Sequence, residues 1–484
     1  MIGQVATPQL VFQPLLPEIL LAVAGIFGML YEAIARRPER SAHLSIALVG
    51  IVGAAAVTLP LWDWGGEPTV LAGAISADRF TVVARLILLA VAALGVLYGA
   101  QALGPRRVRG EFFPLVLFAT LGMTLITAAA DLIVVFLALE ILSLALYVLT
   151  GITGRGRSTE AAMKYFLLGA FSSAFFLYGI AMAYGASGST KIVEIARSLS
   201  GVGGSQALAL VAFALLIIAF AFKVSAAPFH MWTPDVYEGA PTPVTAFMAA
   251  ATKVAAFVAL MRVLMVGFQP LAWEWTPVVW ALAAVSVVVG SVLAIAQRDV
   301  KRMLAYSSVA HAGFILTGLT GLGADGIRAS LFYLVTYAAM TIGAFGVVML
   351  VEGRREGRTS LDDYTGLWRR SPTTAVLMAI FLLSLAGIPP TGGFIAKINV
   401  FGAAASAGHW PLVLIGVLAS VVAAFFYLRV LVLMFMREPV GEGADQPEPA
   451  ARAIVALPAL LVLLLGVFPG IVTGLLDEAA VLRW

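Results

Sequence analysis

The stretch AGIPPTGGFIAK, residues 386–397, interrupts a long apolar run and decides how the chain must fold. The run covers residues 373–404, too many for one straight helix that crosses about 30 Å of hydrocarbon at about 1.5 Å per residue. Two prolines followed by two glycines are expected to break the helix here. Since lipid cannot satisfy free backbone groups, a broken helix at membrane depth lines a cavity or lies buried in protein.

A second interruption of the same kind lies earlier, where FKVSAAPFHMWTPD at residues 222–235 ends another apolar run. Each break lies within nine residues of a lysine, Lys223 or Lys397. We therefore predict two broken helices whose free amides and carbonyls orient water beside an ammonium group. The alternative interpretation is kinking for packing alone.

The composition places the rest of the chain in lipid as well. Of 484 residues, 61% are hydrophobic and 12% are charged, and the mean hydropathy is +1.00; soluble domains contain roughly 25% charged residues. These values exclude disorder, a collagen-like chain and nucleic-acid binding, although the pI is 9.3.

The residue types also exclude redox chemistry in this chain. There is no cysteine, hence no disulfide, no cysteine-ligated iron–sulfur cluster and no thiol nucleophile. The four histidines, His43, His230, His311 and His409, are too scattered for a metal or haem site. Any electron transfer must occur in another protein.

The apolar runs predict an all-α, polytopic membrane protein with fourteen transmembrane helices. The first run is not a cleavable signal peptide, because residues 1–16 contain no Lys or Arg and no cleavage pattern follows. The fourteen runs are 17–35, 43–62, 80–103, 112–129, 131–152, 161–184, 206–228, 242–266, 276–296, 303–322, 328–351, 373–404, 410–436 and 453–475.

The basic residues predict the orientation. With the N-terminus outside, 18 of the 30 Lys and Arg lie in cytoplasmic loops and 5 in outer loops, which satisfies the positive-inside rule with both termini outside. The acidic, Pro/Gly-rich stretch 438–449 is then a flexible cytoplasmic linker. The stretch 185–205 is an interfacial turn or short helix outside.

The lysines are distributed differently from the arginines. Arginine outnumbers lysine 24 to 6, yet Lys164, Lys223, Lys253 and Lys397 fall within predicted spans. A charge at mid-bilayer costs about 3 kcal/mol or more, so it is a functional hypothesis by default. Burial lowers the pKa of a lysine toward neutral pH, whereas arginine stays protonated. This pattern favours a proton carrier.

Glu140, near the centre of the fifth span, is the matching acid. A Glu–Lys pair in low dielectric can take up and release a proton as the pair closes and opens, or it can be a fixed ion pair that joins helices. Lys164 lies about one turn inside its span, from where its side chain can reach the interface. Lys253 is central. His311, in the tenth span, is either a proton relay or a core histidine that donates to a carbonyl, and both interpretations stay open.

The remaining charged groups near span ends receive a structural interpretation. We expect Arg85, Arg262 and Arg429 to be interface anchors. For Arg429, the alternative is a modulating charge in the exit half of the path. For His230, beside the first break, anchoring and proton uptake are equally favoured.

The two broken spans are five apart, and an odd offset places equivalent segments in opposite orientation. We therefore predict two inverted five-helix repeats with broken helices 7 and 12. The expected division is 1–103 for flanking helices 1–3, 104–267 for the first repeat (helices 4–8), 268–437 for the second repeat (helices 9–13), and 438–484 for the linker and last helix.

Three strings resemble the subunit N family of the proton-pumping NADH:quinone oxidoreductase, respiratory complex I. They are LEILSLALY at 139–147, MKYFLLGA at 163–170, and the segment 222–243 that ends in DVYEGAPTP. The resemblance covers nearly the whole chain, and the third string is highly specific. Subunits L and M and the cation/proton antiporters share the fold but differ in that string.

The resemblance implies a role for each interior charge. Glu140 and Lys223 match the coupled charge pair, and Lys164 matches the modulating lysine of the sixth span. Lys253 matches the central connecting lysine, and Lys397 matches the lysine of the distal half-channel. The expected path runs from Lys223 through Lys253 and water, with His311 as an optional relay, to Lys397.

The resemblance also implies the function and the setting. The chain is expected to translocate protons in the membrane arm, beside other membrane-arm subunits, as a multi-pass protein of the bacterial cytoplasmic (inner) membrane with periplasmic termini. It has no cofactor of its own, because NADH, flavin (FMN), iron–sulfur clusters and quinone belong to partner subunits. The alternatives are a subunit of a cation/proton antiporter or of a membrane-bound hydrogenase, and a non-conducting scaffold.

Overall fold

The computed structural model describes residues 11–102, 110–201, 204–353, 357–439 and 448–482. Within these ranges the structure is helical apart from a small antiparallel hairpin, β1 (Thr69–Val70) and β2 (Ile75–Ser76). The all-α prediction is therefore confirmed. Most of the predicted linker at 438–449 lies outside the described residues.

The helices follow the predicted runs closely. They are α1 (Leu16–Ile34), α2 (Arg40–Thr58), α3 (Arg79–Ala102), α4 (Phe112–Ala128), α5 (Leu132–Gly151), α6 (Gly156–Ser187), α7 (Ile192–Ser200), α8 (Gln206–Lys223), α9 (Trp232–Gly239), α10 (Thr242–Arg262), α11 (Ala272–Ile295), α12 (Val300–Leu319), α13 (Gly323–Glu352), α14 (Leu367–Arg370), α15 (Pro372–Ala386), α16 (Gly392–Ser406), α17 (Trp410–Met436), α18 (Pro449–Val467) and α19 (Gly470–Ala479). Short 3₁₀ turns are Gln13–Leu15, Leu59–Asp63, Gln269–Leu271 and Leu361–Tyr364, and a π-helical turn, Val263–Gly267, follows α10. The short helix expected within 185–205 is α7.

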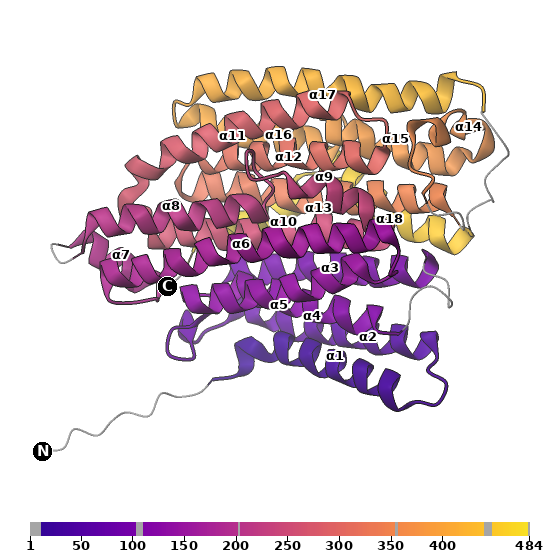
Figure 1. Ribbon diagram of the computed structural model, residues 1–484. Coiled ribbons are helices and arrows are strands. Elements are labelled where there is room, and N and C mark those ends of the chain that lie inside the picture. The colour runs from indigo at the N-terminus through magenta and orange to yellow at the C-terminus, as the bar shows by residue number, and fades with distance from the viewer. Residues whose placement is uncertain (1–10, 103–109, 202–203, 354–356, 440–447, 483–484) are drawn as a thin grey trace, which may run out of the picture.

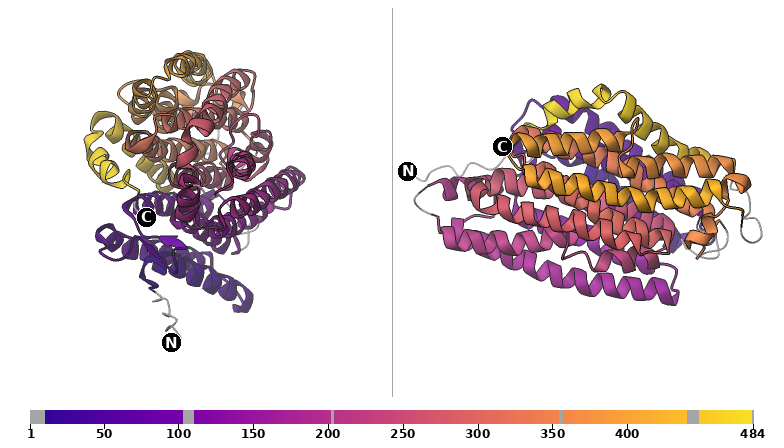
Figure 2. Two further views of the ribbon diagram at one scale, coloured as in Figure 1. Left: turned by 90° about the vertical axis from the view of Figure 1, so that its left-hand side faces the viewer. Right: turned by 90° about the horizontal axis from the view of Figure 1, so that it is seen from above.

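The long helices run side by side along one direction, with α1 and α2 at one edge and α10 and α13 inside (Figures 1 and 2). Helix α1 begins at the end of this bundle where the C-terminus also lies, and we call this end the terminal end (Figure 1). The opposite end carries residues 36–40, 155–157, 298–302, 358 and 369–370, and is called the arginine-rich end.

Within the described residues, 11 helices are long and apolar enough to cross a membrane. The other three predicted spans correspond to α4, of 17 residues, to α12, which starts with Lys301 and Arg302 in its first turn, and to the pair α15 and α16, of 15 residues each.

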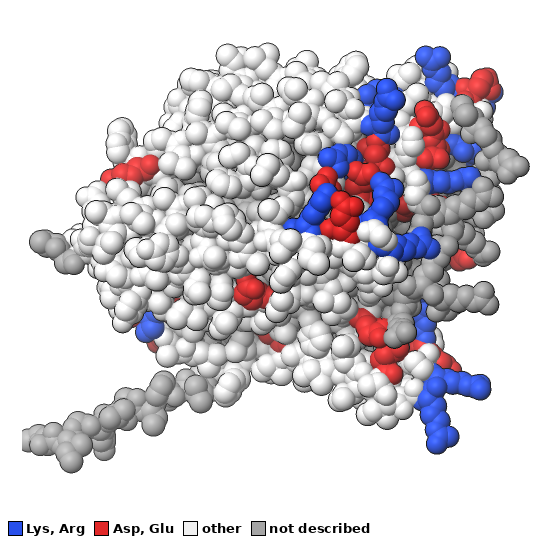
Figure 3. Space-filling view, viewed as in Figure 1, with Lys and Arg blue, Asp and Glu red and all other residues white. Residues whose placement is uncertain are grey.

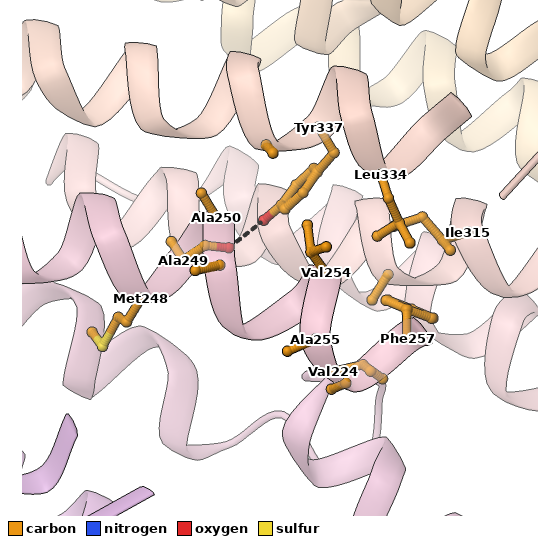
Figure 4. Close-up of a cluster of buried hydrophobic side chains, with 14 of the residues drawn as sticks. Val224, Met248, Ala249, Ala250, Val254, Ala255, Phe257, Ile315, Leu334 and Tyr337 are labelled. Atoms are coloured by element: carbon orange, nitrogen blue, oxygen red, sulfur yellow. Dashed lines mark hydrogen bonds between the residues drawn. The ribbon is translucent and has the colours of Figure 1, made fainter. Parts of the chain in front are cut away.

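Helix α10 forms the centre of the bundle, because every one of its 21 residues is buried. Its many alanines let neighbouring helices approach closely. Figure 4 shows its side chains Ala255 and Phe257 beside Val224, with Ile315 and Leu334 from other helices nearby. A charge on α10 is therefore enclosed by protein and does not face lipid.

Both predicted breaks are present. Helix α8 ends at Lys223 and α9 begins at Trp232, while α15 ends at Ala386 and α16 begins at Gly392. The backbone turns through a left-handed conformation at Ser225 (φ 60°) and at Gly387 (φ 82°).

We expected the two breaks to leave backbone amides free to bond water. This was wrong for several amides, which bond to other groups of the protein instead. In the first break, Ala226 N donates to Ala221 O at 2.8 Å and Ala227 N to Ser286 Oγ at 2.9 Å. In the second, Ile388 N donates to Leu383 O at 3.0 Å. The chain satisfies them itself because unsatisfied amides are costly in a dry interior.

Two of the three expected interface anchors are instead members of buried ion pairs. Arg85 Nε and Nη2 donate to Glu18 Oε1 and Oε2 at 2.9 and 3.0 Å. Arg262 Nη1 and Nη2 donate to Asp78 Oδ2 and Oδ1 at 2.9 and 3.0 Å. Pairing with a carboxylate offsets the cost of burying a guanidinium, which keeps its charge. These contacts join α1 to α3, and the start of α3 to the end of α10.

The third, Arg429, bonds to the end of a neighbouring helix. Its guanidinium donates to the carbonyls of Ile295 and Gln297 at 2.9 and 2.8 Å, where α11 ends and helical carbonyls lack partners.

Replacing Arg262 by Met tests how much a buried ion pair contributes to the stability of the fold. The change leaves the Asp78 carboxylate buried and unpaired, so we expect a loss of about 3–5 kcal/mol of stability. Thermal unfolding in detergent measures it. The matched control is Arg328→Met, because Arg328 pairs with Asp325 and Asp477 on the exposed surface and its loss is expected to cost below about 1 kcal/mol. Equal melting of the two variants contradicts the prediction.

A second prediction concerns the break before α16. Gly393→Ala places a Cβ against the backbone carbonyl of Ser384, and such overpacking costs about 1–3 kcal/mol. Gly402→Ala, in the same helix, meets nothing within 4 Å and is expected to melt as the native protein does. A Gly393→Ala protein as stable as the native one shows that the break has room to relax.

Candidate functional site

Lys223 ends α8 as a buried side chain. Its Nζ donates to Ser143 Oγ at 2.7 Å, and Ser143 in turn donates to the carbonyl of Leu139. The amine also lies 5.8–5.9 Å from the ring centres of Tyr165, Tyr147 and Phe222. The ammonium is thus held by a hydroxyl and three aromatic rings.

Glu140 lies one helical turn before Ser143 on α5 and is half-buried. It accepts a hydrogen bond from Ser173 Oγ of α6. In the described part of the chain it makes no ion pair with Lys223, although its charge acts on both Lys223 and Tyr147. The structure therefore brings the predicted pair into one neighbourhood with Ser143 bonded to the amine.

Lys164 faces the surface and not Lys223. Its Nζ pairs with Glu160 at 2.8 Å and with Asp235 at 2.9 Å, and Asp235 pairs with Arg302 at 2.7 Å. Figure 3 shows acidic and basic side chains gathered toward the arginine-rich end of this face. Lys164 is thus linked through Asp235 to α9, the second half of the broken helix.

Lys253 is fully buried in α10. Its Nζ donates to the carbonyl of Ser308 and lies 5.4 Å from the ring centre of Tyr337. The Tyr337 hydroxyl donates to Ser308 Oγ at 3.0 Å. Among the residues that the structure describes, no carboxylate pairs with this amine.

His311 lies between the interior lysines. Its Nδ1 is 2.7 Å from the Tyr333 hydroxyl and its Nε2 is 3.3 Å from the Tyr427 hydroxyl. The charges of Lys253 and Lys397 both act on its ring. Both ring nitrogens have hydrogen-bond partners, which fits a structural histidine of the core. Both partners are hydroxyl groups, which also fits a proton relay, so both interpretations of His311 stay open.

Lys397 is buried in α16, and its amine bonds to the backbone at the second break. Its Nζ donates to the carbonyl of Ala386 at 2.7 Å and lies 4.8 Å from the ring centre of Phe314. Ala386 is the last residue of α15, where a helical carbonyl has no partner within the helix. A Cβ at Gly387 would come within 2.8 Å of the lysine Cδ, so the glycine gives the side chain its room. The break supplies the acceptor.

The arrangement of the buried amines suits proton transfer. Lys223, Lys253 and Lys397 are buried amines bonded to hydroxyl or carbonyl oxygens rather than to carboxylates. The described residues contain no group of three His, Cys, Asp or Glu that could hold a metal ion.

Sequence reasoning missed the polar groups that hold these amines. Ser143 follows Glu140 by three residues and so shares its helix face, which was a usable signal. Ser308, Tyr337, Tyr333 and Tyr427 are spread over three helices, and nothing in their spacing pairs them.

The comparisons with known proteins define the class. Residues 129–423 match the family described as NADH:quinone oxidoreductase/Mrp antiporter, TM. The chain belongs to this family of multi-pass membrane subunits, which carry no redox cofactor of their own.

Individual relatives within this family show which of its members the chain is similar to in sequence. NADH-quinone oxidoreductase subunit N of Acidothermus cellulolyticus is 44% identical, with 98% of this chain and 97% of that protein covered. A chain of respiratory complex I from Thermus thermophilus is 38% identical, with 95% and 98% covered and a TM-score of 0.81. A chain of the Mrp complex from Dietzia sp. DQ12-45-1b has a TM-score of 0.86 over 97% of both chains, but at 22% identity it shows the fold alone.

Replacing Ser143 by Ala removes the hydroxyl that accepts from Lys223. A hydrogen bond to a charged group is worth about 1.5–3 kcal/mol, so we expect proton pumping in membrane vesicles to fall by about tenfold. Ser200→Ala, whose hydroxyl bonds only within α7 at the terminal end, is the control. Unchanged pumping in Ser143→Ala would show that the rings alone hold the amine.

Proposed function

We propose that this chain is the proton-translocating subunit N of the membrane arm of an NADH:quinone oxidoreductase. The observation that carries the proposal is the set of buried amines without carboxylate partners, Lys223, Lys253 and Lys397, with His311 between the last two. The identity to subunit N over almost the whole chain supports it. NADH, flavin, iron–sulfur clusters and quinone are handled by partner subunits, and other membrane-arm subunits are the neighbours.

We propose fourteen transmembrane helices arranged as two inverted repeats. The first, 104–267, contains α4, α5, α6, the broken pair α8 and α9, and α10; the second, 268–437, contains α11, α12, α13, the broken pair α15 and α16, and α17. The break is the fourth helix of each unit. Because α8 starts at the terminal end and α15 at the arginine-rich end, the two pairs run in opposite directions, which supports the inversion. Residues 1–103 and 438–484 flank the repeats.

For the orientation, we infer that the arginine-rich end faces the cytoplasm in a bacterial cytoplasmic membrane. Both termini then lie on the periplasmic side. The concentration of arginine at one end supports this assignment.

The mechanism that this geometry supports is electrostatic. A charge change in a neighbouring subunit moves the Glu140 carboxylate toward or away from Lys223, and Lys164 modulates the response through Asp235. When Glu140 moves away, the ammonium of Lys223 loses its favourable charge and gives its proton to the path toward Lys253. The proton continues by water and His311 to Lys397 and leaves on the periplasmic side.

A cation/proton antiporter subunit is the second candidate, because the Mrp chain has the same fold. The segment DVYEGAPTP at 235–243 favours the oxidoreductase. Antiport predicts proton movement that depends on Na⁺ or K⁺ and proceeds without NADH, which vesicle assays with and without each cation distinguish.

Lys223→Met in the native membrane tests the proposal. We expect an assembled complex whose NADH-driven vesicle acidification falls by about tenfold or more, because a positioned proton-transferring group is lost. NADH oxidation is recorded beside acidification. The control is Arg437→Met, an exposed loop arginine, and equal effects of the two changes contradict the path.

A further inference from the structure

Tyr147 of α5 is a buried tyrosine whose hydroxyl has no hydrogen-bond partner in the described structure. Only 8% of the residue is exposed, and a buried hydroxyl is normally bonded to protein or water. The amine of Lys223 lies 5.9 Å from the centre of the Tyr147 ring. Tyr147 thus contributes its ring to the surroundings of this amine, while its hydroxyl has no role in the mechanism above.

The unused hydroxyl lies on the same face of α5 as the group that holds the amine. Glu140, Ser143 and Tyr147 are spaced by three and four residues, which places them on one helix face. Long side chains of a helix lean back over the residues three and four positions earlier, so the Tyr147 ring reaches over Ser143. The Ser143 side chain is close enough to influence the Tyr147 hydroxyl. Lys223 therefore has two hydroxyls beside it, of which it bonds only that of Ser143, at 2.7 Å.

A glycine of α6 gives the Tyr147 hydroxyl its place. A Cβ at Gly169 would overlap this hydroxyl, so a larger residue there would displace it. The ring is held by edge-on contacts with Tyr165 and Phe166 of the same helix, at 4.8 and 5.7 Å between ring centres. The hydroxyl is thus kept in a defined position without a bond of its own in the described structure.

The two hydroxyls differ in what they can offer the lysine. A hydroxyl has one hydrogen to donate and two lone pairs that accept. Ser143 already donates its hydrogen to the carbonyl of Leu139, so it can accept from Lys223 but cannot donate to it. When the lysine gives up its proton, its nitrogen gains a lone pair that can accept a hydrogen bond. The hydrogen of Tyr147 is free to make that bond.

We propose that Tyr147 is a positioning residue of Lys223, whose hydroxyl donates to the neutral amine after the lysine has given up its proton. The amine turns on its flexible stem from Ser143 toward Tyr147, and the phenol keeps its own proton. The bond is lost when Lys223 takes up a proton again, because an ammonium has no lone pair. A hydrogen bond to the neutral form favours that form, so Tyr147 assists proton release. The proposal rests on the proton translocation proposed above.

The other groups that face Lys223 do not change when the Tyr147 hydroxyl is removed. The titratable ones are Glu140 of α5, whose charge acts on the amine, and Tyr165 of α6, whose ring centre lies 5.8 Å from it. From α9, Trp232 contributes an indole that donates to a backbone carbonyl. Because Tyr147→Phe leaves these groups in place, a change in the pH dependence of pumping reports the hydroxyl itself.

Tyr147→Phe in the assembled complex tests the proposal. The ratio of acidification to NADH oxidation is recorded in inside-out vesicles prepared at a series of pH values. We expect this ratio to fall at neutral pH and to recover at higher pH, with its midpoint raised by about 0.5–1 pH unit, because the neutral amine loses one hydrogen bond. Tyr98→Phe is the matched control with a native profile, since the Tyr98 hydroxyl is also buried without a partner and lies against a glycine, Gly346.

A tyrosine that only packs gives a different result. Removing a hydroxyl without a partner leaves the ring contacts intact, so a packing role predicts the same profile for Tyr147→Phe as for the native complex. That result overturns the proposal. A midpoint moved to lower pH also overturns it, because the hydroxyl would then favour the ammonium. So does loss of assembly, because the hydroxyl would then have a structural partner.

Gly169→Ala tests the same hydroxyl without removing it. The added methyl group displaces the hydroxyl, and we expect the midpoint to rise as it does in Tyr147→Phe. Gly185→Ala of the same helix is the control, because its Cβ would meet only Leu208, at 3.8 Å. A native profile in an assembled Gly169→Ala complex contradicts the proposal.

Lys223→Met, measured in parallel, separates this inference from the proposed function. If Lys223→Met stops pumping while Tyr147→Phe keeps the native profile, the role of Tyr147 is wrong and the proposed function stands. If Lys223→Met pumps normally, the proposed function falls and the role of Tyr147 falls with it.

Discussion

Hydrocarbon offers no hydrogen bonds, so every charge inside this chain depends on a partner made of protein. The chain solves this in two ways. The two buried guanidinium groups receive carboxylates in two-point contacts, Arg85 from Glu18 and Arg262 from Asp78. Amines receive neutral oxygens, from Ser143, the Ser308 carbonyl and the Ala386 carbonyl. The arginine pairs connect segments that lie far apart in the sequence.

The two solutions have different consequences for a proton. A carboxylate stabilises the charged form of its partner strongly and leaves little reason for the partner to become neutral. A serine hydroxyl or a backbone carbonyl stabilises the ammonium less and can also bond to the neutral amine or to water. The arginine pairs are therefore suited to hold helices together, and the amines are suited to change their protonation state. The chain keeps the two roles on different residue types.

Much of this organisation was predictable from the sequence, and the failures have a common cause. The breaks at 224–231 and 387–391 follow from proline and glycine in apolar runs, and the interior position of Lys253 and Lys397 follows from their place within those runs. The pairing of Glu18 with Arg85, 67 residues apart, does not, because it depends on which helices are neighbours and how each is rotated. The same holds for Lys164, whose outward direction is set by Asp235 on α9, and for the hydroxyls around His311.

The neutral pairs also determine where the chain can sense a membrane voltage. A guanidinium and a carboxylate in contact carry no net charge, so a field across the bilayer exerts almost no net force on them. An unpaired ammonium, by contrast, gains or loses about 2.3 kcal/mol when it crosses 100 mV. Because Arg85 and Arg262 are paired with carboxylates while Lys223, Lys253 and Lys397 are not, the electrical work of moving a proton through the membrane falls on these three amines whenever they are protonated. The arginine–carboxylate pairs that join the surrounding helices contribute almost nothing to this electrical work.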